Sequence, residues 1–142
     1  MTYNTIIPRI GDVYFMRFEG SGCEQCGWRP GLVFQNNTGN RFSPNIIALP
    51  LTSNLKKRNQ PTHVVLPAAD TGLPRDSMVL CENPERISKE RLGEFVTTLP
   101  DRYMSLVAEA SLLATSAIAF LEAEEILRIW KQARSLNATS VA

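Results

Sequence analysis

Histidine and cysteine are scarce in this sequence, and their scarcity excludes several kinds of site. The 142 residues include one histidine and three cysteines. An odd cysteine count argues against the disulfide framework of a small secreted domain. The single histidine, His63, cannot form a two-histidine acid–base pair unless a second copy of the chain supplies the other member. The sequence therefore argues against a disulfide-stabilised secreted domain, and it excludes a two-histidine catalytic pair within one chain.

The cysteines still leave one alternative open. Cys23 and Cys26 form a CxxC pair, and with Cys81 and His63 the chain holds just enough ligands for one Cys₃His zinc site. A lone CxxC is a weak signal, because a metal site of this kind usually shows a second pair. We expect free thiols in a reducing compartment and neither metal nor cofactor, with zinc or redox control as the minor alternative.

Long hydrophobic runs are also missing. No stretch is long enough to cross a membrane without meeting charge, and the first residues lack a basic segment followed by an apolar run. Hydrophobic residues make up 44% of the chain and charged residues 20%, which suits one compact domain with a core. We expect a cytoplasmic protein that does not contact a membrane.

Acidic residues are absent from position 25 to position 69. This tract carries five positive charges, on Arg29, Arg41, Lys56, Lys57 and Arg58, although the whole chain has a formal net charge of only +1. The asymmetry predicts a local site for an anion that bulk charge would not suggest. The plain alternative is a structural Arg29 and a solvated turn at the three consecutive basic residues, since most charge runs lie on surfaces.

Arg29 stands out because its backbone is constrained. Pro30 fixes its own φ and pushes the preceding residue towards extended conformations, so Arg29 enters the following strand in a defined direction. A glycine-rich loop precedes it and carries one carboxylate, Glu24. A fixed cation beside a movable acid suits an anionic ligand.

Strand-like and turn-like segments alternate over the first hundred residues. The expected strands are 11–18, 30–35, 45–51, 62–66 and 77–81, with short extended segments at 86–89 and 94–99, a helical turn near 89–92, and a turn at 36–40. His63 alternates within a strand and is expected to be a partly buried packing residue. The pattern predicts an α+β protein built on a small curled sheet or barrel.

Glycine and proline are absent after Pro100, and the pattern becomes helical. Apolar residues recur at helical spacing from Leu106 to Leu121, and a second apolar stripe follows at Ile126, Ile129, Trp130 and Ala133. One long helix or two abutting helices fit this pattern equally. The second stripe is expected to pack on its own domain, with a dimer or partner contact as the alternative.

RNA cleavage is one chemistry that these residues suit. The RNA's own 2′-hydroxyl must lose a proton, and the phosphorane oxygens need positive charge and hydrogen-bond donors. Arg29 suits charge stabilisation, Thr52 with Ser53 beside it supplies hydroxyl donors, and Glu24 is the best-placed base. No carboxylate cluster accompanies the basic tract, which disfavours a two-metal nuclease. RNA binding without cleavage fits the same residues.

Several ordered motifs together resemble the MazF/PemK toxins, especially their Gram-positive-type branch. The resemblance covers about residues 8–120. The motifs are Gly11-Asp-Val-Tyr-Phe, Gly22-Cys-Glu-Gln-Cys-Gly-Trp-Arg-Pro-Gly, Gly39-Asn-Arg-Phe-Ser-Pro, Leu51-Thr-Ser, Pro61-Thr-His-Val and Arg75-Asp-Ser. The resemblance implies a toxin domain at 8–120 followed by a helical extension at 121–142.

The family also implies a function and partners. It implies an SH3-like barrel closed by a C-terminal helix, a homodimer, and a metal-independent, sequence-specific endoribonuclease that cuts single-stranded RNA. It further implies a MazE-like antitoxin whose acidic segment occupies the RNA groove, and DNA binding in complex with it. By position, the catalytic arginine and threonine fall on Arg29 and Thr52, and the loop pair on Glu24 and Gln25. Ser53, Lys56, Lys57, Arg58 and Asn83 complete the expected RNA-binding set.

The chain departs from the family pattern at two places. Cys23 and Cys26 replace small loop residues, and Cys81-Glu-Asn-Pro-Glu stands where relatives commonly have Leu-Glu-Gln-Ile-Arg. A groove-lining glutamine thus becomes Asn83, and a nearby arginine becomes Glu85. The departures keep a second function open: a catalytically weak barrel that binds RNA or an antitoxin in a regulatory role.

Overall fold

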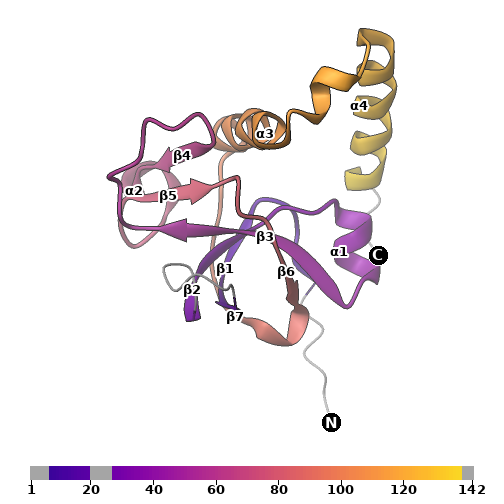
Figure 1. Cartoon of the computed structure of the whole chain (residues 1–142). Helices are drawn as coiled ribbons and strands as arrows, with labels where there is room; N and C mark the ends of the chain where they lie inside the picture. The colour runs from indigo at the N-terminus through magenta and orange to yellow at the C-terminus, as the bar shows by residue number, and fades with distance from the viewer. Residues whose placement is uncertain (1–6, 20–26, 139–142) are drawn as a thin grey trace.

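A curled antiparallel sheet forms the body of the protein, with helices above it and on both of its sides in the view of Figure 1. The computed structural model describes residues 7–19 and 27–138. Seven strands make up the sheet: β1 (Asp12–Phe18), β2 (Gly27–Val33), β3 (Asn45–Thr52), β4 (His63–Leu66), β5 (Ser77–Leu80), β6 (Glu85–Ser88) and β7 (Leu92–Thr98). Their order is β4-β5-β3-β2-β1-β7, with β6 paired to β3. The expected α+β curled sheet is confirmed.

The sheet curls because its central strands bury side chains on both faces. Along β1, Val13 packs into one core cluster while Tyr14 and Met16 pack into the other. The first cluster lies between the sheet and helix α3 (Asp101–Thr115), which contributes Val107 and Ala110. The second cluster is completed by side chains of β3, β6 and the start of β7. A flat sheet with one solvated face would not need apolar residues at successive positions.

Residues 36–40, expected to be a turn, begin a short helix instead. Helix α1 (Asn37–Phe42) starts at Asn36, whose side-chain oxygen accepts a 2.8 Å hydrogen bond from the backbone N–H of Gly39. The same asparagine and glycine types that suit a turn also suit a helix N-cap, so local composition did not separate the two. A second short helix, α2 (Ala68–Thr71), lies in a stretch for which we had no prediction.

The C-terminal segment forms two helices rather than one long helix. Helix α3 ends at Ser116, which adopts a left-handed φ of 55°, and a 3₁₀ turn η3 (Ala117–Phe120) leads into α4 (Ala123–Ala138). Another 3₁₀ turn, η2 (Lys89–Arg91), confirms the helical turn expected before β7. On α3 the buried residues are Val107 and Ala110, whereas Leu106 and Leu113 of the expected apolar series are exposed.

Helix α4 stands apart from the sheet and contacts the body mainly at α1 (Figure 1). Asn137 and Leu136 at its end accept hydrogen bonds from Asn37 and Thr38, with donor–acceptor distances of 2.8 to 3.3 Å. None of the α4 residues is buried, and Trp130 is 53% exposed. The expectation that the stripe on α4 packs on its own domain is therefore wrong for the described residues.

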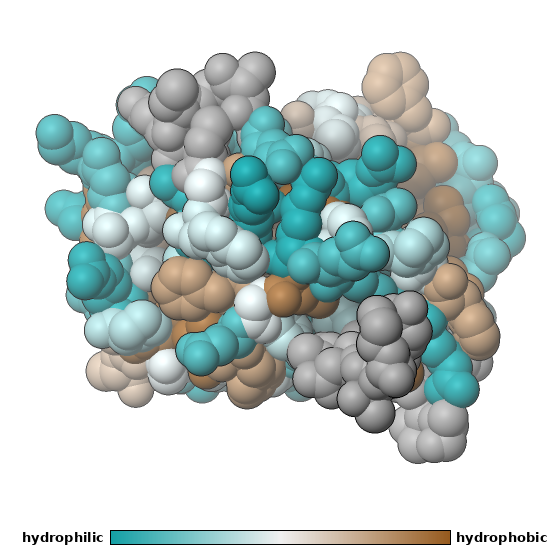
Figure 2. All heavy atoms as spheres, turned by 90° about the horizontal axis from the view of Figure 1, so that it is seen from below, coloured by the Kyte–Doolittle hydropathy of each residue, from teal (hydrophilic) through white to brown (hydrophobic). Residues whose placement is uncertain are grey.

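Polar side chains dominate the face of the molecule seen in Figure 2, where apolar side chains appear as separate groups rather than as one continuous patch. Among the described residues, no helix combines the length and the apolar character needed to cross a bilayer.

Candidate active site

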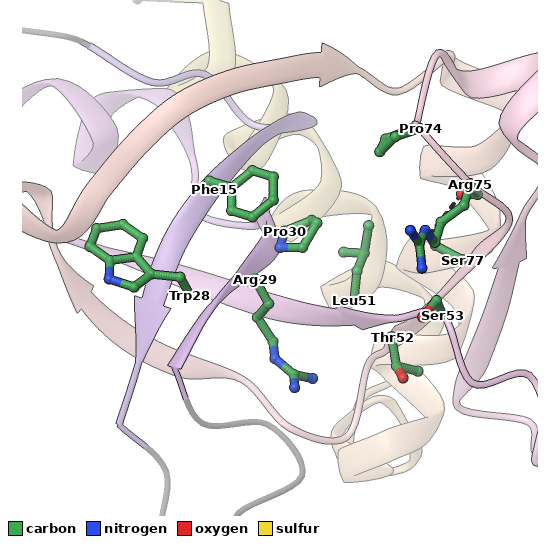
Figure 3. Close-up of a pocket in the computed structure, with 10 residues that line it drawn as sticks. All are labelled: Phe15, Trp28, Arg29, Pro30, Leu51, Thr52, Ser53, Pro74, Arg75 and Ser77. Carbon is green, nitrogen blue, oxygen red and sulfur yellow. Dashed lines mark hydrogen bonds between the residues drawn. The ribbon is translucent and has the colours of Figure 1, made fainter.

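A cavity of about 340 Å³ lies where β1, β2 and β3 meet the loop before β5. Arg29 and Thr52, which the sequence singled out, both line it, and so does Ser53. Figure 3 shows Trp28 and Phe15 on one side of Pro30 and Thr52, Ser53 and Arg75 on the other. Arg29 projects between the two sides. The described residues that line it are Phe15, Trp28, Arg29, Pro30, Leu51, Thr52, Ser53, Pro74, Arg75 and Ser77.

Strand β2 fixes the position of Arg29. Its backbone pairs in register with β1, where Met16 lies opposite Arg29 and Phe15 lies opposite Pro30. Gly31 leaves room on this face for the Met16 and Phe18 side chains, because a Cβ built there would lie 2.5 Å from Met16 Sδ and 2.7 Å from Phe18 Cζ. The arginine thus leaves a strand held by pairing, by proline and by close packing, rather than a loose loop.

The Arg29 side chain has donors to spare. It forms no ion pair with any described residue, and its Nε is buried without a hydrogen-bond partner among them. A buried guanidinium nitrogen without a partner is uncommon in folded proteins. The alternative of a structural Arg29 that bridges the preceding loop and the sheet involves residues 20–26, which lie outside the described residues.

Thr52 ends β3 on the opposite side of the cavity. It lies in register with Met78 of β5, and its Oγ1 accepts a 3.1 Å hydrogen bond from the backbone N–H of Asn54. This bond uses an oxygen lone pair and leaves the hydroxyl proton available for donation. Ser53 follows it into the cavity. The strand end therefore presents an oriented hydroxyl donor towards the space that Arg29 enters.

Arg75 adds a second guanidinium that the sequence reading did not include in the site. The Ser77 hydroxyl donates a 2.9 Å hydrogen bond to the Arg75 carbonyl and so shapes the loop. The neighbouring acid, Asp76, turns to α2, where its Oδ1 accepts from the Ala68 N–H at 2.8 Å. Among the described residues, the lining holds two arginines and no carboxylate, which makes this part of the cavity electropositive.

Phe15 and Trp28 also line the cavity although neither was named as a site residue. Trp28 directly precedes Arg29, and Phe15 faces Pro30 across the β1–β2 pair. Because Trp28 directly precedes Arg29, the sequence offers a reason to consider it as a site residue. Phe15 reaches the site only through strand pairing, which the sequence does not display.

The remaining predicted residues are spread more widely. Lys56, Lys57 and Arg58 lie in the exposed loop that continues from Ser53, but they do not line the cavity. Asn83 lies in the turn between β5 and β6, away from the lining. Glu24 and Gln25 fall outside the described residues, as do Cys23 and Cys26.

His63 and Cys81 have separate environments. The His63 ring contacts the Lys57 carbonyl and the Glu82 carboxylate at 2.7 Å each, so both of its nitrogens are engaged. Cys81 is buried, and burial raises the pKa of its thiol to about 11. Among the described residues no three potential ligands gather where they could hold a metal ion.

Glu85, one of the departures noted in the sequence, accepts a hydrogen bond from the backbone. Its Oε1 accepts a 3.1 Å hydrogen bond from the backbone N–H of Glu19, just after β1. Strand β6 places it opposite Ala48 of β3. It does not line the cavity, so its negative charge does not enter the lining.

Comparison with known proteins agrees with this geometry. A sequence profile of the family described as the PemK-like, MazF-like toxin of type II toxin-antitoxin systems matches residues 9–113. The chain belongs to this family. Endoribonuclease EndoA from Bacillus subtilis is 42% identical to this chain over 116 residues that cover 81% of this chain and all of EndoA.

Solved structures show the same fold. MazF from Deinococcus radiodurans superposes with a TM-score of 0.67 at 26% identity, covering 78% of this chain and 98% of that one. An endoribonuclease from Mycobacterial species, solved with its cognate antitoxin, gives a TM-score of 0.64 at 27% identity, covering 78% of this chain and 96% of that one. The cavity therefore belongs to a MazF-like toxin fold.

Proposed function

We propose that the protein is the toxin of a type II toxin-antitoxin system and a metal-independent endoribonuclease that cuts single-stranded RNA. The observation that carries the proposal is the meeting of Arg29, without an ion-pair partner among the described residues, and Thr52 in one electropositive cavity. Family membership and the endoribonuclease EndoA as a relative support the same reaction.

Arg29 and Thr52 of the cavity and the preceding residue Glu24 have roles in this proposed reaction. The RNA 2′-hydroxyl attacks the adjacent phosphorus, a P–O bond forms, and the bond to the 5′-oxygen of the next nucleotide breaks. Arg29 stabilises the charge on the non-bridging oxygens, since its planar fork matches a phosphate and stays charged at neutral pH. The Thr52 hydroxyl donates a further hydrogen bond. Glu24, which precedes β2 in the sequence, is the proposed base that takes the 2′-hydroxyl proton, and the leaving 5′-oxygen takes a proton from water.

The donor set of the cavity supports metal independence. A divalent cation that bridges phosphate oxygens is held by carboxylates, and the lining residues that the structure describes include none. Two guanidinium groups supply the positive charge in the place where a metal would otherwise act. The proposed nucleophile is part of the RNA, so no metal-bound hydroxide is required.

The same cavity is the proposed docking place for an antitoxin. A solved Mycobacterial relative carries its cognate antitoxin, and an acidic segment would be attracted by the two cavity arginines and by the basic residues 56–58. Binding there would exclude RNA. The homodimer stays a prediction that sedimentation of the purified chain would test.

The test is digestion of a long RNA in EDTA, with the new ends mapped. We expect cuts at defined sites that leave 2′,3′-cyclic or 3′-phosphate ends. A matched oligonucleotide with a single 2′-deoxy residue at the cut position should remain intact. RNA that is bound but uncut would instead support the regulatory RNA-binding protein, and cleavage that needs added metal would refute the proposed mechanism.

A further inference from the structure

Two exposed aromatic side chains form one wall of the cavity and have no task in the reaction described above. Trp28 is 58% exposed and Phe15 is 38% exposed, and both line the same space as Arg29. Other exposed aromatic side chains of the described residues, such as Phe42 and Phe120, do not line this cavity, whereas Trp28 and Phe15 offer apolar surface beside Arg29. This aromatic wall shares the cavity with the guanidinium groups of Arg29 and Arg75. A ligand that fits both combines a flat apolar group with negative charge.

The indole of Trp28 is held in place along one edge. Trp28 lies on β2 opposite Arg17 of β1, and its ring reaches across to Gly93 of β7. A Cβ built on Gly93 would lie 3.2 Å from Trp28 Cζ3, tighter than ordinary side-chain contacts, so the glycine leaves room for the ring to lie against the strand. A ring supported in this way loses little freedom when a ligand covers its open surface.

A nucleotide has the required combination of groups. A phosphate on the Arg29 guanidinium places the attached nucleoside within reach of the aromatic wall, because Arg29, Trp28 and Phe15 line one cavity. Unpaired bases stack readily on aromatic side chains. In Figure 3, Trp28 and Phe15 lie on the opposite side of Arg29 from Thr52. The base on this wall therefore belongs to a nucleotide flanking the scissile phosphate.

We propose that Trp28, with Phe15 beside it, is a stacking platform for one unpaired nucleobase next to the cleaved bond. The platform deepens the proposed ribonuclease function and rests on it. A base in a duplex is already stacked and paired, whereas a base in a single strand can turn onto the indole at little cost. The platform thus gives the site a physical reason to select single-stranded RNA.

Substitution of Trp28 tests the platform when it is paired with a matched control. Trp28→Ala should reduce kcat/KM on a short single-stranded substrate by roughly ten- to a hundredfold, the range that base–aromatic stacking gives. Trp28→Phe, which keeps a flat ring, should recover most of the loss. Trp130→Ala removes the other tryptophan, on the distant helix α4, and should leave cleavage unchanged.

Abasic substrates separate stacking from a general structural effect. At one position flanking the cut, removal of the base should slow the wild type strongly and should not slow Trp28→Ala further. Removal of bases at other positions should affect both proteins equally. Equal, additive losses at every position would overturn the platform, and so would a wild-type cleavage rate in Trp28→Ala.

Fluorescence provides a readout that does not depend on the folding of Trp28→Ala. In Trp130→Phe, Trp28 is the single remaining tryptophan, and a non-cleavable 2′-O-methyl oligonucleotide should quench its emission, whereas the abasic version should not. Quenching by an acidic antitoxin peptide but not by the oligonucleotide would assign the wall to the antitoxin and overturn the platform. If the wild type cuts no RNA, the proposed function itself fails; if it cuts RNA without Trp28 quenching, only the platform fails.

Discussion

At the scale of single residues, the account depends on donors that the fold leaves unused. Arg29 keeps its guanidinium free of ion pairs among the described residues, and Thr52 keeps a hydroxyl proton although its oxygen already accepts from Asn54. Charge-assisted hydrogen bonds to a phosphate are stronger than neutral ones, so both groups gain more from RNA than from water. Hydrogen-bond donors that are not already engaged can stabilise the negative charge that develops in the transition state of RNA cleavage.

Thr52→Val tests the hydroxyl donor. The two side chains have similar shapes, so the fold should keep its stability to within about 1 kcal/mol, while cleavage falls by roughly ten- to a thousandfold because one donor to the transition state is lost. Thr52→Ser, which keeps the hydroxyl, serves as the control. Single-turnover cleavage rates measure both, and equal rates for valine and threonine would remove Thr52 from the mechanism.

Cys81 predicts how stability depends on pH. Burial raises the pKa of its thiol from its ordinary value of 9.0 to about 11 in the folded protein. A raised folded pKa means that the stabilisation is complete below pH 9 and is lost as the pH rises from about 9 to 11, by up to about 2 kcal/mol. Urea unfolding of wild type and Cys81→Ala under reducing conditions measures the difference. Parallel pH profiles of the two proteins would contradict the burial argument.

At the scale of elements, β2 positions Arg29 because it is hydrogen-bonded to a strand on each side, β1 and β3. It pairs with β1 along six residues and with β3 along three, and Gly31 leaves room for the Met16 side chain. The residues that follow Arg29 in the chain therefore determine where its guanidinium points.

Gly31→Ala should disturb this arrangement. The added Cβ would meet Met16 Sδ at 2.5 Å and Phe18 Cζ at 2.7 Å, so overpacking should destabilise the protein by about 1–3 kcal/mol and slow cleavage as Arg29 shifts. Met16→Ala makes room, so the double variant should lose less stability than the sum of the single variants. Strictly additive losses would show that the close approach is not what limits this position.

The elements also show what sequence could and could not predict. Most strands and the direction of Arg29 follow from local signals, because alternation, glycine and proline act on neighbouring residues. The break between α3 and α4 depends on a left-handed Ser116, a serine conformation that no local motif announces. Phe15 and Arg75 join Arg29 only when strands pair across long loops, so the sequence located the cation and the hydroxyl but not the whole wall.

At the scale of the molecule, helix α4 lies beyond the part of the chain that the family profile matches. The family profile ends at residue 113, and EndoA is covered completely by 116 aligned residues, whereas this chain has 142. Helix α4 has no buried residue and is held to α1 by hydrogen bonds from Asn37 and Thr38. We propose that residues 8–120 carry the activity and that 121–142 are a separate extension.

Deletion of residues 121–142 tests this division. Loss of the few hydrogen bonds to α1 should lower Tm by about 2–8 °C, because each contributes on the order of 1 kcal/mol. The cleavage rate should stay close to that of the full chain. Thermal unfolding and cleavage assays decide the point, and loss of activity in a folded truncated protein would show that α4 takes part in the function.

The most direct test of the central claim compares Arg29→Ala with the wild type in single-turnover cleavage at saturating protein, alongside affinity for a non-cleavable 2′-O-methyl analogue. If Arg29 stabilises charge at the scissile phosphate, the rate should fall by at least about a hundredfold, while the affinity changes far less. A rate equal to that of the wild type, or a loss confined to affinity, would contradict the account.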